Sequence, residues 1–209
     1  MDKHVFIVRH GETEFNRLGI VQGSGVDASL NETGRLQAQA FYDHYHAHPF
    51  DLVLTSTLKR TQETMQPFIA AGLPWEQHAT INEICWGKHE GQKSTPEMHK
   101  QYKEVTEAWE QGHLDARLEG AESAEDMRAR LSEFVRHLNE RPEPNILICS
   151  HGRAMRALMC LLREQPLQQM NTYKHANTGL YKAAYQQQRY TFLLENDLRH
   201  LEPIKTKRH

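Results

Sequence analysis

Two histidines and two arginines of this chain come just after short apolar segments that are typical of strands. Arg9 and His10 follow the first such segment, Arg60 follows the second by one helical turn, and His151 follows the third. In an open α/β sheet, ligands bind just beyond the carboxyl ends of the strands. One histidine at a strand end is more often structural than catalytic. Four such residues at three strand ends favour a functional site.

The residue types in this set suit a phosphoryl group. The planar guanidinium of arginine matches phosphate oxygens, so two arginines and the amides of a helix N-terminus make a strong site for a dianion. A histidine there can attack phosphorus, because nearby positive charge lowers its pKa and keeps one ring nitrogen unprotonated. A second histidine can stabilise the charge that grows on the phosphoryl oxygens. Glu83, in the turn INEICWG, is the candidate for the acid that protonates the leaving oxygen.

The hydrophobic pattern predicts the elements that must position these residues. Apolar, β-branched segments at 4–8, 51–55 and 145–149 are typical of a parallel sheet that is covered on both faces. Closing strands are predicted at 178–183 and 190–194. Amphipathic helical patterns separate the first three segments, which implies right-handed crossovers. We therefore expect a three-layer α/β/α sandwich with a mostly parallel sheet.

Several local signals mark the helices and the segments between them. Asn31 is a predicted N-cap, and Ser123 with Asp126 forms a predicted capping box. Pro67 is expected to kink its helix or to end it early. Residues 86–120 have only weak periodicity and are predicted to form a mobile lid over the sheet. The whole chain, 1–209, is expected to be a single domain that carries this lid.

Charge and composition exclude several classes of protein. The 25 lysines and arginines are balanced by 27 acidic residues, which argues against a nucleic-acid partner or an acidic membrane surface. No apolar run approaches the ~20 residues that span a bilayer. The start, MDKHVFIVRHGE, does not fit a secretory signal, and three cysteines argue against a disulfide framework. We expect a cytoplasmic protein whose basic residues 204–209 fray.

The 14 histidines raise the question of a metal site. His44 and His48 have a spacing that could hold zinc on a helix, and His46 lies between them. No cysteine or carboxylate nearby completes a ligand set, so solvated surface histidines are the favoured interpretation. The sequence thus predicts no metal and no cofactor.

Eight segments along the chain resemble, in the same order, the motifs of the histidine phosphatase superfamily in its phosphoglycerate-mutase-like branch. The segments are RHGETEFN at 9–16, QG at 22–23 with Asp27, LNETGRLQA at 30–38, TSTLKRTQET at 55–64, NEICWGKHEG at 82–91, GAESAEDMRAR at 120–130, SHGRAMRAL at 150–158 and Asn177-Thr178. RHG alone would be a weak signal, but the ordered set is highly specific. The loop 22–30 departs from the family pattern, because the spacing between Gly23 and Asp27 is stretched and Ser29 replaces the common proline.

The resemblance implies a two-step reaction. His10 would attack phosphorus while Glu83 protonates the departing alcohol, and Glu83 would then deprotonate the water that attacks phosphohistidine. Arg9 and Arg60 would clamp the phosphate, and His151 would be the second histidine of the pocket. Four further positions are assigned to phosphate binding: Asn16, Gln22, Gly23 and Gly152.

The resemblance also leaves open other enzymatic activities and one non-enzymatic function. A mutase needs a second anion site, and residues 86–120 contain four lysines and Arg117 but no adjacent pair of arginines. A phosphatase acting on a small phosphorylated metabolite is therefore favoured over a mutase or a sugar bisphosphatase. A non-catalytic phosphate-binding regulatory protein is a distant alternative. The residues that would carry out the reaction are all present: Arg9, His10, Arg60, Glu83 and His151. A homodimer is left open.

Overall fold

The computed structural model describes residues 3–205, and its centre is a sheet of six strands. The strands are β1 (Lys3–Arg9), β2 (Leu52–Thr55), β3 (Trp75–Gln77), β4 (Asn145–Ser150), β5 (Leu180–Gln186) and β6 (Arg189–Asp197). Their order is β3-β2-β4-β1-β5-β6. The first four strands of that order are parallel to their neighbours, and β5 and β6 add antiparallel pairs at one edge. The predicted mostly parallel sheet is confirmed.

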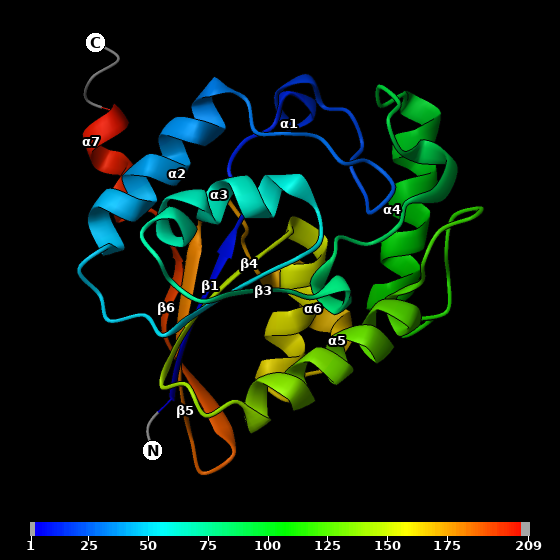
Figure 1. The fold of residues 1–209 in the computed structure, drawn as a ribbon. Coiled ribbons are helices and arrows are strands. Elements are labelled where there is room, and N and C mark those ends of the chain that lie inside the picture. The colour runs from blue at the N-terminus through cyan, green and yellow to red at the C-terminus, as the bar shows by residue number, and fades with distance from the viewer. Residues whose placement is uncertain (1–2, 206–209) are drawn as a thin grey trace.

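Helices cover both faces of this sheet. They are α1 (Glu14–Leu18), α2 (Glu32–Tyr45), α3 (Lys59–Ala70), α4 (Pro96–Glu110), α5 (Ala124–Glu140), α6 (Gly152–Leu162) and α7 (Glu202–Lys205). Short 3-10 helices lie at Ala79–Ile81, Gly87–His89, Leu167–Thr172 and Arg199–Leu201. Figure 1 shows α2 and α3 on one side of the sheet and α5 and α6 on the other, as the three-layer prediction requires.

The alternation of side chains along β1 explains the two covering layers. Val5 and Ile7 belong to the buried cluster that includes the apolar stripes of α5 and α6. Phe6 and Val8 point to the opposite face and belong to the cluster that includes Phe41 of α2. All four β1 side chains are buried, and each contributes about 1.5–3 kcal/mol to folding by leaving water. A strand that is apolar on both faces needs helices on both sides.

The predicted helix caps are confirmed, and of the two effects expected of Pro67, a kink or an early end, the early end does not occur. Asn31 accepts a hydrogen bond from the backbone of Gly34, and Ser123 with Asp126 forms the capping box of α5. Helix α3 does not end at Pro67 but continues to Ala70. It stops before Gly72, whose φ of +93° is the left-handed conformation that glycine adopts readily.

Residues 86–120 contain more regular structure than their weak periodicity indicated. Helix α4 occupies fifteen of these residues and stands beside α5 and α6 in Figure 1. Its buried side chains are only Thr106 and Trp109, so most of the helix surface is polar and the apolar stripe is thin. Thr95 caps its N-terminus, with Pro96 at the first helical position.

No helix among residues 3–205 has both the length and the apolar character needed to cross a bilayer. Of the basic segment predicted to fray, residues 204 and 205 lie in α7, and residues 206–209 lie outside the described part of the chain.

Candidate active site

Three neighbouring parallel strands bring the predicted residues to one edge of the sheet. β4 lies between β1 and β2, and Arg9 at the end of β1 is in register with Ser150 at the end of β4. His10 and His151, which come next in each chain segment, have ring centroids 5.2 Å apart. Arg60, in the first turn of α3, reaches His151 from the end of β2. The structure therefore places these side chains together, as their strand-end positions predict.

His10 is buried in a setting that fixes which ring nitrogen is free. Its Nδ1 lies 2.7 Å from the carbonyl oxygen of Gly11. Because a carbonyl only accepts, Nδ1 carries the hydrogen and Nε2 keeps its lone pair. Burial lowers the pKa of His10 well below its ordinary value, and the positive charges of Arg60 and Arg9 lower it further. The ring is therefore neutral, with Nε2 available as a nucleophile.

The backbone on both sides of His10 is held by hydrogen bonds. Its amide donates to the carbonyl of Ser150 at 3.0 Å, and its own carbonyl accepts from the side chain of Asn177 at 3.0 Å. The amide of Gly11 donates to the hydroxyl of Thr64 on α3 at 2.9 Å. A ring held at both neighbouring peptides keeps its orientation when a substrate arrives, which favours rapid attack.

Arg9 and Arg60 carry positive charge that no carboxylate in the described part of the chain neutralises by direct contact. Neither makes an ion pair within residues 3–205. Arg60 is fully buried and donates to the carbonyls of Gly23 and Val26 at 3.1 and 2.7 Å. Arg9 donates to the carbonyl of His175 at 2.8 Å, and burial lowers the pKa of Arg9 to about 10. A buried Arg60 and a half-buried Arg9 without an anionic partner mark a site for an anionic ligand.

His151 uses both of its ring nitrogens within the protein. Its Nδ1 accepts a hydrogen bond from Nε of Arg60 at 3.1 Å, so its Nε2 carries the hydrogen and donates to Oγ of Ser56 at 2.8 Å. Burial, with help from Arg60, holds the pKa of His151 well below its ordinary value. His151 thus orients Arg60, and a phosphoryl oxygen would reach its ring only by replacing one of these partners.

Glu83 lies at the N-terminus of α6. One carboxylate oxygen accepts from the amides of Ile84 and Ala154 at 3.0 and 2.9 Å, and the other accepts from the amide of Arg153 at 3.1 Å. The first amides of a helix have no partner within the helix, so the carboxylate caps α6. Arg130 of α5 fixes the preceding backbone by donating to the carbonyls at residues 80 and 82. Glu83 is therefore held beside the strand ends by contacts from two helices.

Asn16 and Gln22 meet at the hydroxyl of Thr13. Asn16 closes the capping box of α1 with Thr13, and its Oδ1 also lies 3.3 Å from Nδ2 of Asn177. Gln22 donates from Nε2 to Oγ1 of Thr13 at 2.7 Å. Oε1 of Gln22 is buried and has no hydrogen-bond partner in the described part of the chain. Asn16, assigned by the resemblance to phosphate contact, and Gln22, assigned to the pocket wall, are therefore both attached to Thr13 in the segment that follows β1.

Gly23 and Gly152 allow close approaches that a side chain would block. A Cβ at Gly23 would lie 1.9 Å from Oε1 of Glu90 and 2.5 Å from the carbonyl of Ile84. A Cβ at Gly152, the first residue of α6, would lie 3.0 Å from Nδ1 of His175. Glu90 also accepts from the amide of residue 25 at 2.8 Å, which anchors the stretched loop 22–30. Both glycines therefore allow neighbouring segments to pack closely beside the strand ends.

A second group of side chains beside the strand ends, two arginines and a histidine, was not predicted. Arg153 and Arg156 of α6, together with His175, form what we call the α6 arginine cluster. Burial, as the largest cause, and the positive charges of Arg9, Arg156 and Arg153 together lower the pKa of His175 to about 3. Arg153 and Arg156 share Oδ1 of Asn171 as acceptor, at 2.6 and 3.1 Å.

Within the α6 arginine cluster, Arg153 also packs against the segment 86–120. The guanidinium of Arg153 lies 5.7 Å from the ring centroid of Tyr102 on α4 and bonds its hydroxyl. Nε of Arg156 is buried and has no partner among residues 3–205. A signal for the pair was present in the sequence, because Arg153 and Arg156 are three residues apart in SHGRAMRAL and so share one face of the helix.

The low pKa of His175 predicts acid destabilisation. The unfolded chain takes up this proton near pH 6.5, whereas the folded chain holds off until about pH 3. Between those values the unfolded state binds more protons, so stability is full above pH 6.5 and is lost as the pH falls towards 3. Because His175 is partly exposed, its effect is smaller than the full slope expected for one proton. For His175→Gln we therefore expect the pH dependence of the free energy of unfolding to flatten by about 1 kcal/mol per pH unit.

Urea unfolding at pH 7 and pH 5 measures this difference. The change in stability between the two pH values is compared, so any constant loss of contacts in the variant cancels. His44→Gln, at an exposed histidine, is the matched control and should keep the wild-type slope. An unchanged slope in His175→Gln would contradict the assignment.

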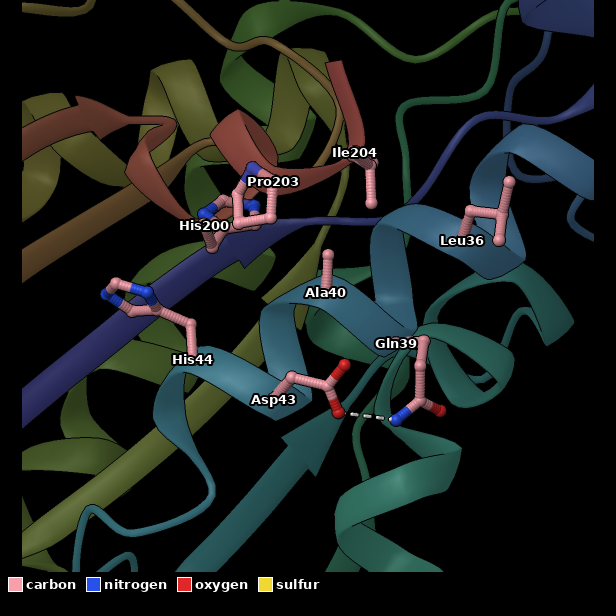
Figure 2. A pocket seen from close by; sticks show the side chains of 8 residues that line it. All are labelled: Leu36, Gln39, Ala40, Asp43, His44, His200, Pro203 and Ile204. Atoms are coloured by element: carbon pink, nitrogen blue, oxygen red, sulfur yellow. Dashed lines mark hydrogen bonds between the residues drawn. The ribbon is translucent and has the colours of Figure 1, made fainter. Parts of the chain in front are cut away.

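A separate hollow lies between α2 and the C-terminal residues. Figure 2 shows Asp43 and Gln39 of α2 joined by a hydrogen bond of 2.8 Å on one side of it, with His200 and Ile204 opposite. Among the side chains that the structure describes, no arginine or lysine lines this hollow, and none of the residues at the strand ends does.

Comparison with known proteins agrees with this geometry. The model of the histidine phosphatase superfamily (branch 1) matches residues 5–198. The chain is 28% identical over 163 residues to a 2,3-bisphosphoglycerate-dependent phosphoglycerate mutase 2 of Gloeobacter violaceus, covering 73% of this chain and 72% of that one. It is 32% identical over 168 residues to a 6-phosphofructo-2-kinase/fructose-2,6-bisphosphatase of Gallus gallus, covering 79% of this chain. The match spans only 34% of the length of that relative.

A solved structure supports the same relationship. The alpha-ribazole phosphatase from Shigella flexneri superposes with a TM-score of 0.82 at 26% identity, covering 93% of this chain and 96% of that one. The family match and the superposition therefore agree on the family and on the fold.

Proposed function

We propose that this chain, which belongs to the histidine phosphatase superfamily (branch 1), hydrolyses small-molecule phosphate esters through a phosphohistidine on His10. The observation that carries the proposal is the state of His10: a neutral, buried ring with Nε2 free, between two arginines that have no carboxylate partner. A nucleophile inside a cationic pocket suits attack on a phosphate dianion.

The first step transfers the phosphoryl group to the enzyme. Arg9 and Arg60 bind the phosphoryl oxygens, and Nε2 of His10 forms a bond to phosphorus as the ester P–O bond breaks. Glu83, in its protonated form, gives its proton to the leaving oxygen. The second step reverses the roles, since Glu83 takes a proton from water and the resulting hydroxide displaces His10 from phosphorus. The products are an alcohol and inorganic phosphate, and His10 and Glu83 return to their starting states.

The two arginines also account for a reaction that needs no metal ion. They neutralise the charge that builds on the phosphoryl oxygens, which is the role that a divalent cation plays in other phosphoryl-transfer enzymes. We therefore propose a metal-independent phosphatase.

The α6 arginine cluster favours a second candidate, a bisphosphatase or a mutase-type phosphoryl transfer. Either reaction requires a site for a second anionic group of the substrate. The sequence argued against such a site because residues 86–120 contain no arginine pair. Helix α6 supplies Arg153 and Arg156 instead, and Nε of Arg156 has no partner in the described part of the chain. A substrate that carries two anionic groups would occupy both the strand ends and this cluster.

The leaving group would lie against residues 86–120, which we propose form the lid of a single catalytic domain. A mostly apolar hollow of about 190 Å³ is present there. Its lining comes from the lid and the neighbouring loop: Val21, Trp86, His89, Ser94, Met98, His99 and Tyr102. Tyr102 links this hollow to Arg153, so the lid and the second anion site would select the substrate together.

The experiment is a phosphate-release screen over metabolite monophosphates and bisphosphates, with a nitrophenyl phosphate as generic substrate and His10→Ala as the blank. We expect turnover in the presence of a chelator and competitive inhibition by vanadate, which adopts the geometry of the transferring phosphoryl group. Activity that a chelator abolishes and magnesium or zinc restores would overturn metal independence. No turnover on any substrate would support a non-catalytic binding protein.

The same screen distinguishes the two candidates through Arg156→Met, which keeps the packing of the side chain but removes its charge. If the α6 arginine cluster binds a second anion, kcat/KM for the best bisphosphate should fall about 10–100-fold. Nitrophenyl phosphate, which has one anionic group, should change by less than about 3-fold on the same reasoning. Equal effects on both would leave the simple monoesterase as the function.

A further inference from the structure

A cluster of metal-ligating side chains lies where β3 faces the end of α5. Glu76 and His78 are two residues apart along the β3 segment, a spacing that points side chains to one face. His137 approaches that face from the last turn of α5. One ligand atom from each of the three residues lies within 4.8 Å of the other two. None of the three belongs to the phosphate site.

Two ring nitrogens of this cluster are buried without a hydrogen bond. Nε2 of His78 and Nε2 of His137 make no hydrogen bond among residues 3–205, and Nε2 of His78 has an ion-pair contact of 3.4 Å with Oε2 of Glu76. The two rings are close, with centroids 4.7 Å apart and planes tilted by 43°. Most buried polar atoms in folded proteins are hydrogen-bonded, so two nitrogens without a hydrogen bond in one small space need an explanation. A shared cation would satisfy both.

We propose that Glu76, His78 and His137 bind a divalent transition metal of the zinc class. Two imidazole nitrogens and one carboxylate oxygen are ligands that zinc favours, and water can complete the tetrahedron. Bonds of about 2.0–2.1 Å place tetrahedral ligands about 3.3 Å apart. Oε2 of Glu76 and Nε2 of His78 are already 3.4 Å apart, so only a small movement of His137 is needed to close the site.

Arg141 supplies the outer contact that a ligating carboxylate requires. Its Nη2 donates to Oε1 of Glu76 at 2.8 Å, whereas the bond from Nη1 to Oε2 is longer, at 3.2 Å. Oε2 can therefore turn to a metal while Oε1 stays bonded to Arg141. Hydrogen bonds of this kind orient metal ligands and are part of most protein metal sites.

The site would fasten the segment that leads to Glu83. His78 is followed by the 3-10 helix Ala79–Ile81, and α5 already holds this segment through Arg130. A metal at His78 and His137 would add a second attachment between the same two elements. We expect a structural role, since the cations at the strand ends already serve the phosphoryl group.

The test uses full-length protein freed of metal by a chelator and then titrated with zinc. Calorimetry should show one zinc per chain with micromolar or tighter affinity. At zinc 100-fold above Kd the Tm should rise by about 5–10 °C. Cobalt(II) in place of zinc should give the intense visible absorption of a tetrahedral site. Turnover of nitrophenyl phosphate should be the same with and without zinc.

Matched variants locate the site. His78→Gln and His137→Gln should each weaken zinc binding at least about 10-fold and abolish the cobalt spectrum. His44→Gln, at the exposed histidine whose spacing also suggested a metal, should bind as the wild type does. Wild-type affinity in both site variants would overturn the proposal. If the variants fail to fold, the cobalt spectrum of the unmodified protein provides the test. Weak absorption of the octahedral type alone would also overturn the proposed site.

Discussion

His10→Ala should abolish turnover, with a loss of at least about 10⁴-fold in kcat on every substrate, because it removes the side chain on which the proposed covalent intermediate forms. His151 cannot substitute, since its two ring nitrogens bond Arg60 and Ser56. The measurement is steady-state phosphate release at saturating substrate. The variant should still bind phosphate, because Arg9 and Arg60 remain.

Control measurements separate chemistry from folding in this variant. The ring of His10 makes only one hydrogen bond, to Gly11, so its loss should leave the fold intact. His44→Ala, at an exposed position, should keep wild-type turnover. A His10→Ala protein that is folded and retains more than a tenth of wild-type kcat would refute the assignment of the nucleophile.

Glu83→Gln should have an effect that depends on the leaving group. General acid catalysis contributes about 10²–10⁴-fold when the departing oxygen is a poor leaving group. We expect a loss of that size on alkyl phosphates such as sugar phosphates, and a smaller loss on nitrophenyl phosphate, whose leaving group hardly needs a proton. Glutamine still offers a carbonyl oxygen to the amides of Ile84 and Ala154, so the cap of α6 largely survives.

Two measurements complete the test of Glu83. Burst kinetics show whether phosphorylation limits the rate, as the comparison of leaving groups requires. Glu90→Gln is the matched control, because the carboxylate of Glu90 accepts from the amides of Trp86 and Gly25 and so holds the loop. If Glu83→Gln slows phosphorylation of both substrate types equally, Glu83 is not the acid. Glu90 would then be the first carboxylate to reconsider.

The arrangement of the strand ends could be predicted because it depends on short-range patterns. Each strand near the site is a continuous apolar segment, and the rule that ligands gather at the carboxyl ends of parallel strands needs no further information. The position of Arg60 one turn into its helix follows from the same rule. The resemblance to a known family then suggested roles for positions such as Asn16 and Gln22, which no local pattern distinguishes.

The rest of the fold and site depends on contacts between distant parts of the chain. β3 has three residues at a sheet edge, two of them exposed, so it lacks an apolar segment. His175 lies in no helix or strand, and it contacts Arg9, which is 166 residues away in the sequence. Glu83 caps α6 by accepting from the amides of Arg153 and Ala154, which lie 70 and 71 residues later in the sequence. The proposed metal ligands Glu76 and His137 come together only because α5 packs against the segment that follows β3, and neither belongs to a local motif.

The most direct test of the proposed mechanism is a rapid-quench experiment with a substrate labelled in its phosphoryl group. If His10 is the nucleophile, label should appear on the protein within one turnover, in a linkage that is labile in acid and stable in base. Peptide mapping should place it on His10, His10→Ala should carry none, and His151→Ala should acquire it slowly. Label that persists unchanged in His10→Ala, or full turnover with no labelled protein at any quench time, would contradict the phosphohistidine mechanism.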